Sequence, residues 1–160
     1  MKNLLSLAVL CISFTTLFSC SKDSNNDSNL VGIWKLTNYD IGVSTDVDKD
    51  GVEHKNILNE IVCSVNETLE FETNKSMTSS DSFHHEVKVS KVDDSYLVNV
   101  ECSDGYISSI NVLTEEEFTE YESYIEGNQL TLVYANSIKV YNEDFTEVIE
   151  TKDLIKVYTK

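Results

Sequence analysis

Three aspartates in one short segment carry the clearest chemical signal in the sequence. Asp46, Asp48 and Asp50 stand at alternate positions, and a glycine follows the last of them. Carboxylate oxygens at positions 1, 3 and 5 of such a loop converge on one hard cation, because the glycine permits the tight turn. The backbone carbonyl of Val52 would add a further ligand. This spacing predicts a calcium site.

The ligand set for calcium is incomplete by comparison with an EF-hand. An EF-hand loop ends in a bidentate acid at position 12, and in this chain that position is Ile57. Glu60 or Glu53 would have to supply the missing carboxylate from the segment that follows. We therefore expect weak calcium binding, and the alternative is an acidic turn exposed to water.

Other candidate residues for metal binding or catalysis give weaker patterns. The chain has His54, His84 and His85, but adjacent histidines on a strand point to opposite faces and do not easily bind one ion. A surface hairpin is the preferred interpretation for that pair. No serine lies in a Gly-x-Ser-x-Gly turn, and the acids of 115–120 are typical of a solvated charge run. The sequence therefore does not indicate an enzyme.

Residues 1–19 have the pattern of a secretion signal. Lys2 supplies the positive start, and the apolar stretch that follows is too short to span a bilayer permanently. The segment from Leu17 to Cys20 resembles the lipobox of bacterial lipoproteins, with a large apolar residue three places before the cysteine and a small one directly before it. This resemblance implies cleavage before Cys20, a diacylglycerol on its sulfur and an acylated amino terminus, which together anchor the chain in a membrane. The alternative is a plain signal peptide.

The stretch 20–29 is polar and predicts a flexible acylated tether ahead of a single domain at 30–160. Its Ser-Lys-Asp start resembles the export tags of Bacteroidota lipoproteins, although only one acid, Asp23, is in place. The resemblance implies a lipid-anchored protein of the outer membrane. Display at the cell surface and attachment on the periplasmic side both remain open.

The charge of the chain excludes nucleic acid as a partner. The 160 residues contain 28 acids, 12 lysines and no arginine, which leaves a formal charge of −16. Removal of residues 1–19 takes away one lysine and no acid, so the mature chain carries −17. Such a charge repels nucleic-acid phosphates and anionic lipid head groups. The length suits one domain with a sizeable apolar core.

The folded part contains two cysteines, Cys63 and Cys102. A secreted chain reaches an oxidising compartment, so we expect these two residues to form a disulfide. A closed loop of about 40 residues would stabilise the fold by roughly 4 kcal/mol on the chain-entropy model. Two buried free thiols are the alternative.

Hydrophobic residues recur with period two along most of the domain, which predicts an all-β fold. Residues 118–125 suit a strand or a helix, and we expect a strand there. Only 55–62 has helical spacing, which predicts one short helix. The expected strands are 33–39, 68–72, 87–91, 96–102, 107–113, 118–125, 130–134, 138–141, 147–149 and 154–158. Short strands at this spacing are typical of antiparallel barrels and sandwiches.

Several segments, taken in order, resemble the lipocalin-like domains of lipoproteins. Gly32 and Trp34 form a Gly-x-Trp in the first strand, and a cysteine followed by a Thr-Leu-x-Phe strand comes at 63–71. The segments 125–132 and 156–158 resemble the family's ending. The resemblance implies an up-and-down barrel of about eight strands with Trp34 plugging one end and no catalytic residues. The chain departs from the family pattern after the second strand, where Asn-Lys-Ser replaces a glycine turn.

Together these features predict a membrane-anchored lipoprotein with a non-catalytic, lipocalin-like module that binds a small apolar ligand. The alternative is a protein-interaction, inhibitor or assembly subunit of the cell envelope with a solid barrel. A hydrolase would need two carboxylates converging in a cleft. The expected core residues are Trp34, Leu36, Leu69, Phe71, Leu130 and Leu132.

Overall fold

The computed structural model describes residues 29–80, 85–102, 109–112 and 121–160. The predicted signal, Cys20 and nearly all of the predicted tether lie outside these ranges, as do parts of the expected strands 107–113 and 118–125. The described residues form one β-sheet with a single short 3-10 helix.

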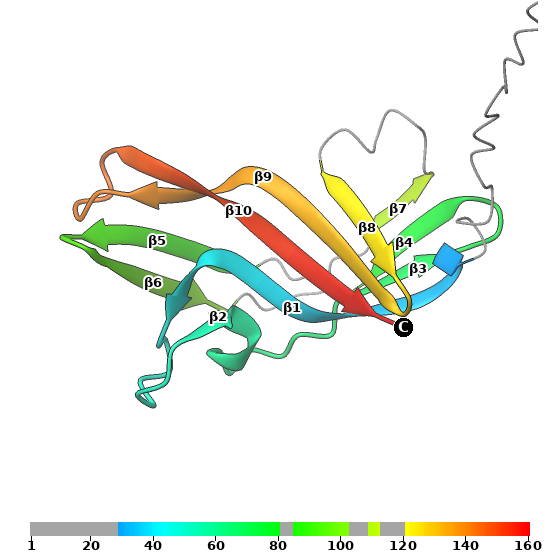
Figure 1. The fold of residues 1–160 in the computed structure, drawn as a ribbon, viewed down its shortest axis with the longest axis horizontal. Helices are drawn as coiled ribbons and strands as arrows, with labels where there is room; N and C mark the ends of the chain where they lie inside the picture. The colour runs from blue at the N-terminus through cyan, green and yellow to red at the C-terminus, as the bar shows by residue number, and fades with distance from the viewer. Residues whose placement is uncertain (1–28, 81–84, 103–108, 113–120) are drawn as a thin grey trace, which may run out of the picture.

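The elements, in chain order, are β1 (Gly32–Thr45), β2 (His54–Asn56), η1 (Ile57–Asn59), β3 (Thr68–Phe71), β4 (Ser76–Ser80), β5 (Glu86–Val92), β6 (Ser95–Glu101), β7 (Ser109–Val112), β8 (Glu122–Glu126), β9 (Gln129–Tyr141) and β10 (Val148–Thr159). The long strands β1, β9 and β10 run along the molecule, with β5 and β6 toward one end and β3, β4, β7 and β8 toward the other (Figure 1). All pairings are antiparallel except a short parallel contact between β5 and β9.

The sheet curls strongly but does not close into a barrel (Figure 1). Seven strands pair in the order β8-β9-β10-β1-β3-β4-β7, and β7 and β8 form no ladder with each other within the described residues. The all-β class is therefore confirmed, and the expected closed up-and-down barrel is wrong. β8 is five residues long, is exposed throughout and has a glutamate at each end. Charged, short edge strands of this kind resist further pairing.

The β5–β6 hairpin interrupts the up-and-down order. It lies between β4 and β7 in the sequence, yet it joins the sheet beside β9, where Val89 pairs with Val140. Periodicity predicts both strands of the hairpin, but it carries no information about a partner 50 residues away.

Four expected strands are in fact two long ones. The polar residues near Asn136 and near Asp153 read in the sequence as breaks between strands, but they face each other across the β9–β10 hairpin. Asp153 accepts a hydrogen bond from the backbone N–H of Asn136 at 2.8 Å, and the Thr151 hydroxyl donates to the Asn136 side chain at 2.8 Å. The polar groups of the two strands thus form hydrogen bonds with each other. Both β9 and β10 therefore continue past this point, with a register shift.

The short helix expected at 55–62 is reduced to the 3-10 turn η1. The side chain of Asn56 accepts from the backbone N–H of Leu58 at 3.2 Å and from that of Tyr39 at 3.0 Å, which fixes the turn against β1. Ile57 is fully buried, and the chain leaves the helical path at Glu60. β2 and β4 were not predicted from the sequence, because β2 has only three residues and β4 is mostly polar.

The core lies on the concave face of the curl. All six expected core residues are buried, so that prediction is confirmed. Trp34 has no exposed surface, and its indole N–H donates to the backbone carbonyl of Leu30 at 2.7 Å. Gly32 has φ 128°, a conformation that favours glycine, and a Cβ there would lie 2.8 Å from the side chain of Lys160. The remaining buried apolar residues are Tyr39, Ile41, Val43, Ile57, Val89, Val140, Leu154 and Tyr158.

A buried carboxylate, Glu67, sits among these apolar side chains. Only 2% of the residue is exposed, yet it accepts hydrogen bonds from Tyr158 and from Lys156, whose Nζ lies 3.0 Å from Oε1 and 3.3 Å from Oε2. The backbone carbonyl of Glu67 also accepts from the N–H of Leu36 at 3.0 Å. Because β3 and β10 flank β1 on opposite sides, Glu67 ties three neighbouring strands together.

The buried pair gives a prediction for stability. Lys156→Met should cost about 3 to 5 kcal/mol in the free energy of unfolding, because it leaves the Glu67 charge buried without its partner. Adding Glu67→Gln to Lys156→Met should recover part of that loss. Urea denaturation measures both, with Lys35→Met, on the exposed side of β1, as the control. An equal loss in the single and double variants would contradict the pairing.

Two tyrosines beside Glu67 give a prediction for pH. Burial, followed by the negative charge of Glu67, raises the pKa of Tyr39 from 10.0 to about 12. Burial and the same carboxylate also raise the pKa of Tyr158. The unfolded chain therefore ionises first, and stability that is complete below pH 10 falls as the pH rises towards 12, by roughly 3 kcal/mol for Tyr39.

Urea midpoints measured from about pH 9 to pH 12 test this slope. The double variant Tyr39→Phe/Tyr158→Phe should have a flatter profile than the parent chain, whatever its stability at neutral pH. Equal slopes for the two proteins would show that these phenols are not protected in the fold.

Candidate functional site

The three aspartates of the predicted calcium site lie in the loop 46–53, which joins β1 to β2. The loop wraps on itself because Lys49 and Gly51 adopt positive φ values of 63° and 91°. One oxygen from each of Asp46, Asp48 and Asp50 lies within 4.8 Å of the others. The structure thus brings together the carboxylates that the spacing predicted.

Each of these carboxylates already uses one oxygen to accept a loop N–H. Asp46 accepts from Gly51 at 3.0 Å, Asp48 from Asp50 at 3.1 Å, and Asp50 from Val52 at 2.7 Å. The second oxygen of Asp46, Oδ1, is buried and has no hydrogen-bond partner. The loop's own amides therefore hold the three side chains in a converging arrangement.

The buried side chain of Glu60 contacts the backbone of the segment that leads into this loop. The residue is 2% exposed, and its Oε2 accepts from the backbone N–H of Val47 at 2.8 Å while its Oε1 contacts Nδ1 of His54. Glu60 does not belong to the group of converging carboxylates. The roles of Asp46, Asp48, Asp50, Val52 and Glu60 as calcium ligands remain predictions.

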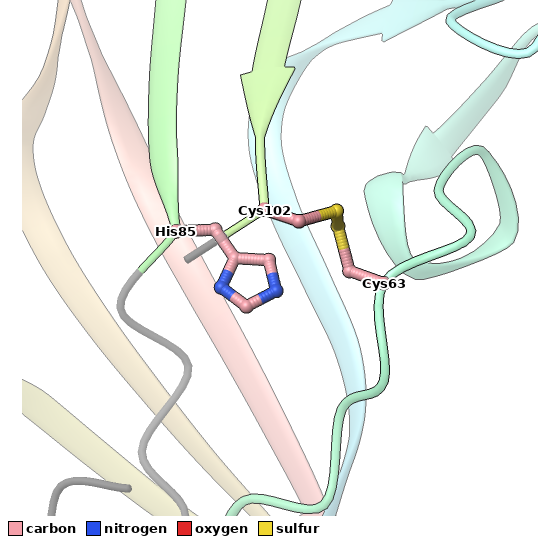
Figure 2. A group of neighbouring side chains, drawn as sticks. All are labelled: Cys63, His85 and Cys102. Atoms are coloured by element: carbon pink, nitrogen blue, oxygen red, sulfur yellow. A yellow bond between two sulfur atoms is a disulfide. The ribbon is translucent and has the colours of Figure 1, made fainter. Parts of the chain in front are cut away.

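The expected disulfide between Cys63 and Cys102 is confirmed, with Cα atoms 5.7 Å apart. It links the segment after η1 to the end of β6. The imidazole of His85, just before β5, lies beside the two sulfurs (Figure 2). A ring nitrogen of His85 and both sulfurs lie within 4.8 Å of one another.

The position of His85 beside the disulfide was not predicted from the sequence, although the register of the hairpin indicates it. In the β5–β6 ladder Glu86 faces Glu101 and Val87 faces Val100. Extending that register by one step sets His85 opposite Cys102. His85 is half-buried beside the disulfide, in contrast to the surface hairpin that we expected, and His84 lies outside the described residues.

An open hollow of about 410 Å³ lies where β5 and β9 diverge. The ladder between these strands is confined to the pairs Val89–Val140 and Ser90–Tyr141, and the hollow forms on the side of Glu86 and Ser137. Its apolar lining comes from Val87, Ile138, Tyr141 and Phe145, and charged side chains of Glu86, Lys88 and Lys139 border it.

Phe145 is held at this hollow by the turn between β9 and β10. The rings of Phe145 and Tyr141 lie 5.8 Å apart between centroids, and Phe145 has φ 55°, an unusual value for a bulky residue. The side chain of Asn142 accepts from the backbone N–H groups of Thr146 and Glu147 at 2.9 and 3.2 Å, which fixes the turn. Nearly half of the Phe145 surface is exposed.

A cluster of polar side chains fastens the β5–β6 hairpin to β10. Glu150 lies 2.5 Å from Nζ of Lys152 and accepts from the Tyr96 hydroxyl at 3.0 Å. The hydrogen bond from Lys152, followed by that from Tyr96, holds the pKa of the Glu150 carboxyl below its usual value. Nζ of Lys91 lies 4.0 Å from the same carboxylate and 5.2 Å from the Tyr96 ring centroid. The charged and polar groups of this cluster are paired with one another. We therefore assign the cluster a structural role.

No protein-family model, curated protein or solved structure matches this chain. In the described ranges there is also no helix with the length and apolar character needed to cross a membrane. The function is therefore inferred from the residues of the chain itself.

Calcium binding by the loop 46–53 is a testable prediction. Isothermal titration of the parent chain should give one Ca²⁺ with a dissociation constant on the order of 10⁻⁴ to 10⁻³ M, as in extracellular modules with incomplete ligand sets. Asp48→Asn should weaken it about tenfold, since it removes one charged ligand. Asp94→Asn, in the exposed β5–β6 turn, is the matched control. Equal heats with and without the Asp48 substitution would exclude the site.

Proposed function

We propose that this chain is a membrane-anchored, non-catalytic binding module of the bacterial cell envelope. The lipobox-like segment ending at Cys20 supports the anchor, and the hollow beside Phe145 supports the binding role. The main support for the binding role is the composition of this hollow. It combines an apolar lining with charged borders, which is typical of a ligand site. Its volume falls within the range of small-molecule sites, about 300 to 1,000 Å³.

The lining of the hollow favours an apolar group with a polar end. Val87, Ile138 and the rings of Tyr141 and Phe145 would cover the apolar part, while Lys88 and Lys139 would face its polar end. The backbone of the turn that carries Phe145 is held by hydrogen bonds to Asn142, so little backbone entropy would be lost on binding. This site lies beside the sheet, in contrast to the central lumen of a lipocalin.

A protein partner is the second candidate, and core packing favours it. Trp34, Ile41, Val89 and Val140 have no exposed surface, so the concave face is occupied by the protein's own side chains. Further apolar side chains are exposed near Phe145 in the sequence, since Val148 and Ile149 at the start of β10 are 41% and 49% exposed. Exposed apolar side chains of this kind suit a protein side chain inserted into the hollow.

The resemblance to lipocalin-like lipoproteins fits either candidate. Seven strands follow the pairing order of an up-and-down barrel, with first and last strands paired, as that family's architecture implies. The gap between β7 and β8 and the inserted β5–β6 hairpin are where this chain departs from it.

Site-specific photo-crosslinking in cells tests the binding role. A photoreactive residue at position 145 should trap one discrete species, because Phe145 reaches into the hollow. The same residue at Ile33, which is exposed where β1 pairs with β3, is the control. A small mass increment at 145 supports a small ligand, and a protein adduct supports the second candidate. Identical adducts at both positions, or no adduct at 145, would refute the proposal.

The anchor is tested separately with Cys20→Ala. The parent chain should incorporate an alkyne-labelled fatty acid and fractionate with membranes, because two or more acyl chains give stable attachment. The variant should lose the label and move to the soluble fraction. A parent chain without label would refute the lipoprotein assignment and leave the hollow unaffected.

A further inference from the structure

The disulfide region brings together three residues of metal-binding type, two cysteines and one histidine, from separate segments of the chain. Cys63 follows η1, Cys102 ends the β5–β6 hairpin, and His85 begins it. Their sulfur and nitrogen atoms lie within 4.8 Å of one another (Figure 2). Thiolate and imidazole are the ligands that Zn²⁺ and other soft or borderline ions prefer.

We propose that Cys63, Cys102 and His85 form a redox-controlled site for one Zn²⁺ ion, closed while the disulfide is intact and available once it is reduced. An exogenous dithiol, such as a thiol–disulfide oxidoreductase, supplies the reduction. Two electrons and two protons pass from the dithiol to the sulfur pair, the S–S bond breaks, and the dithiol becomes a disulfide. Zinc then binds two thiolates and the imidazole, and the two thiol protons are released to water.

The geometry requires only a small rearrangement. Zn–S bonds of about 2.3 Å in a tetrahedral site set the two sulfurs about 3.8 Å apart. The Cα atoms of Cys63 and Cys102 are 5.7 Å apart, so rotation of the two side chains about Cα–Cβ can provide this separation without moving the backbone. A ring nitrogen of His85 already lies within 4.8 Å of both sulfurs.

The three residues remain close after reduction because other contacts position their segments. The β5–β6 ladder runs up to the Glu86–Glu101 pair, next to His85 and Cys102. Cys63 is placed by η1 on one side, where Ile57 is fully buried, and by β3 on the other, where Glu67 is fixed by Lys156. Cys102 is exposed, so a dithiol and a metal ion can both reach the sulfurs.

The site is chemically distinct from the aspartate loop. That loop offers only oxygen atoms and selects hard cations such as calcium, in either redox state. The sulfur site selects softer ions and exists only in the reduced chain. Zinc binding that depends on reduction therefore separates the two sites in one experiment.

The test is zinc titration of the full chain in detergent, with Cys11→Ser and Cys20→Ser so that Cys63 and Cys102 are the only thiols. Native mass spectrometry should show one Zn²⁺ on the dithiol-reduced chain and none on the oxidised chain at the same concentration. Co²⁺ in place of Zn²⁺ should give a thiolate-to-metal absorption band in the reduced chain alone.

His85→Ala should weaken zinc binding to the reduced chain at least tenfold, because it removes one of three protein ligands. Asn99→Ala, exposed on β6 of the same hairpin, is the matched control and should bind zinc as the parent does. Zinc should also raise the thermal midpoint of the reduced chain without changing that of a Cys63→Ser variant. Absence of reduction-dependent zinc, or equal affinity with and without His85, would overturn the proposal.

Discussion

One buried carboxylate, Glu67, holds together the neighbouring strands on which the rest of the sheet is built. It directly precedes β3, while its partners Lys156 and Tyr158 lie on β10, on the other side of β1. A charge removed from water is stable only when its partners surround it, so the three strands must keep this spacing. The second half of β1 pairs with β2, where Thr45 faces His54. The aspartate loop forms where that half ends.

The β5–β6 hairpin determines the other end of the molecule. It enters the sheet beside β9 through two residue pairs and is fastened to β10 by the Glu150 cluster. Because the ladder with β9 is so short, the strands separate and leave the hollow next to Phe145. The open end of the same hairpin sets His85 beside Cys102. A single inserted hairpin thus creates both the hollow and the sulfur site.

The sequence predicted local features well and long-range pairing poorly. The six core residues, the disulfide and the convergence of Asp46, Asp48 and Asp50 follow from alternation, cysteine count and loop spacing, which are local or combinatorial signals. The continuity of β9 through Asn136 was missed because the partners of this residue lie on β10: its backbone N–H donates to Asp153, 17 residues away, and its side chain accepts from Thr151. Closure of the barrel was wrongly expected because alternation does not specify which edges meet. His85 was missed because its significance comes from register.

The pairing of β1 with β10 has a consequence for biogenesis. These strands lie at opposite ends of the domain, with Lys35 facing Thr159 and Leu36 facing Tyr158. The centre of the sheet is therefore assembled last, after the C-terminal strand has emerged, and the chain has high contact order with correspondingly slow folding. If a chain with this topology were exported across a membrane from its N-terminus, it would stay unfolded during translocation. Export systems that translocate unfolded polypeptides require this. In such a chain the sheet could be completed only after β10 had crossed as well.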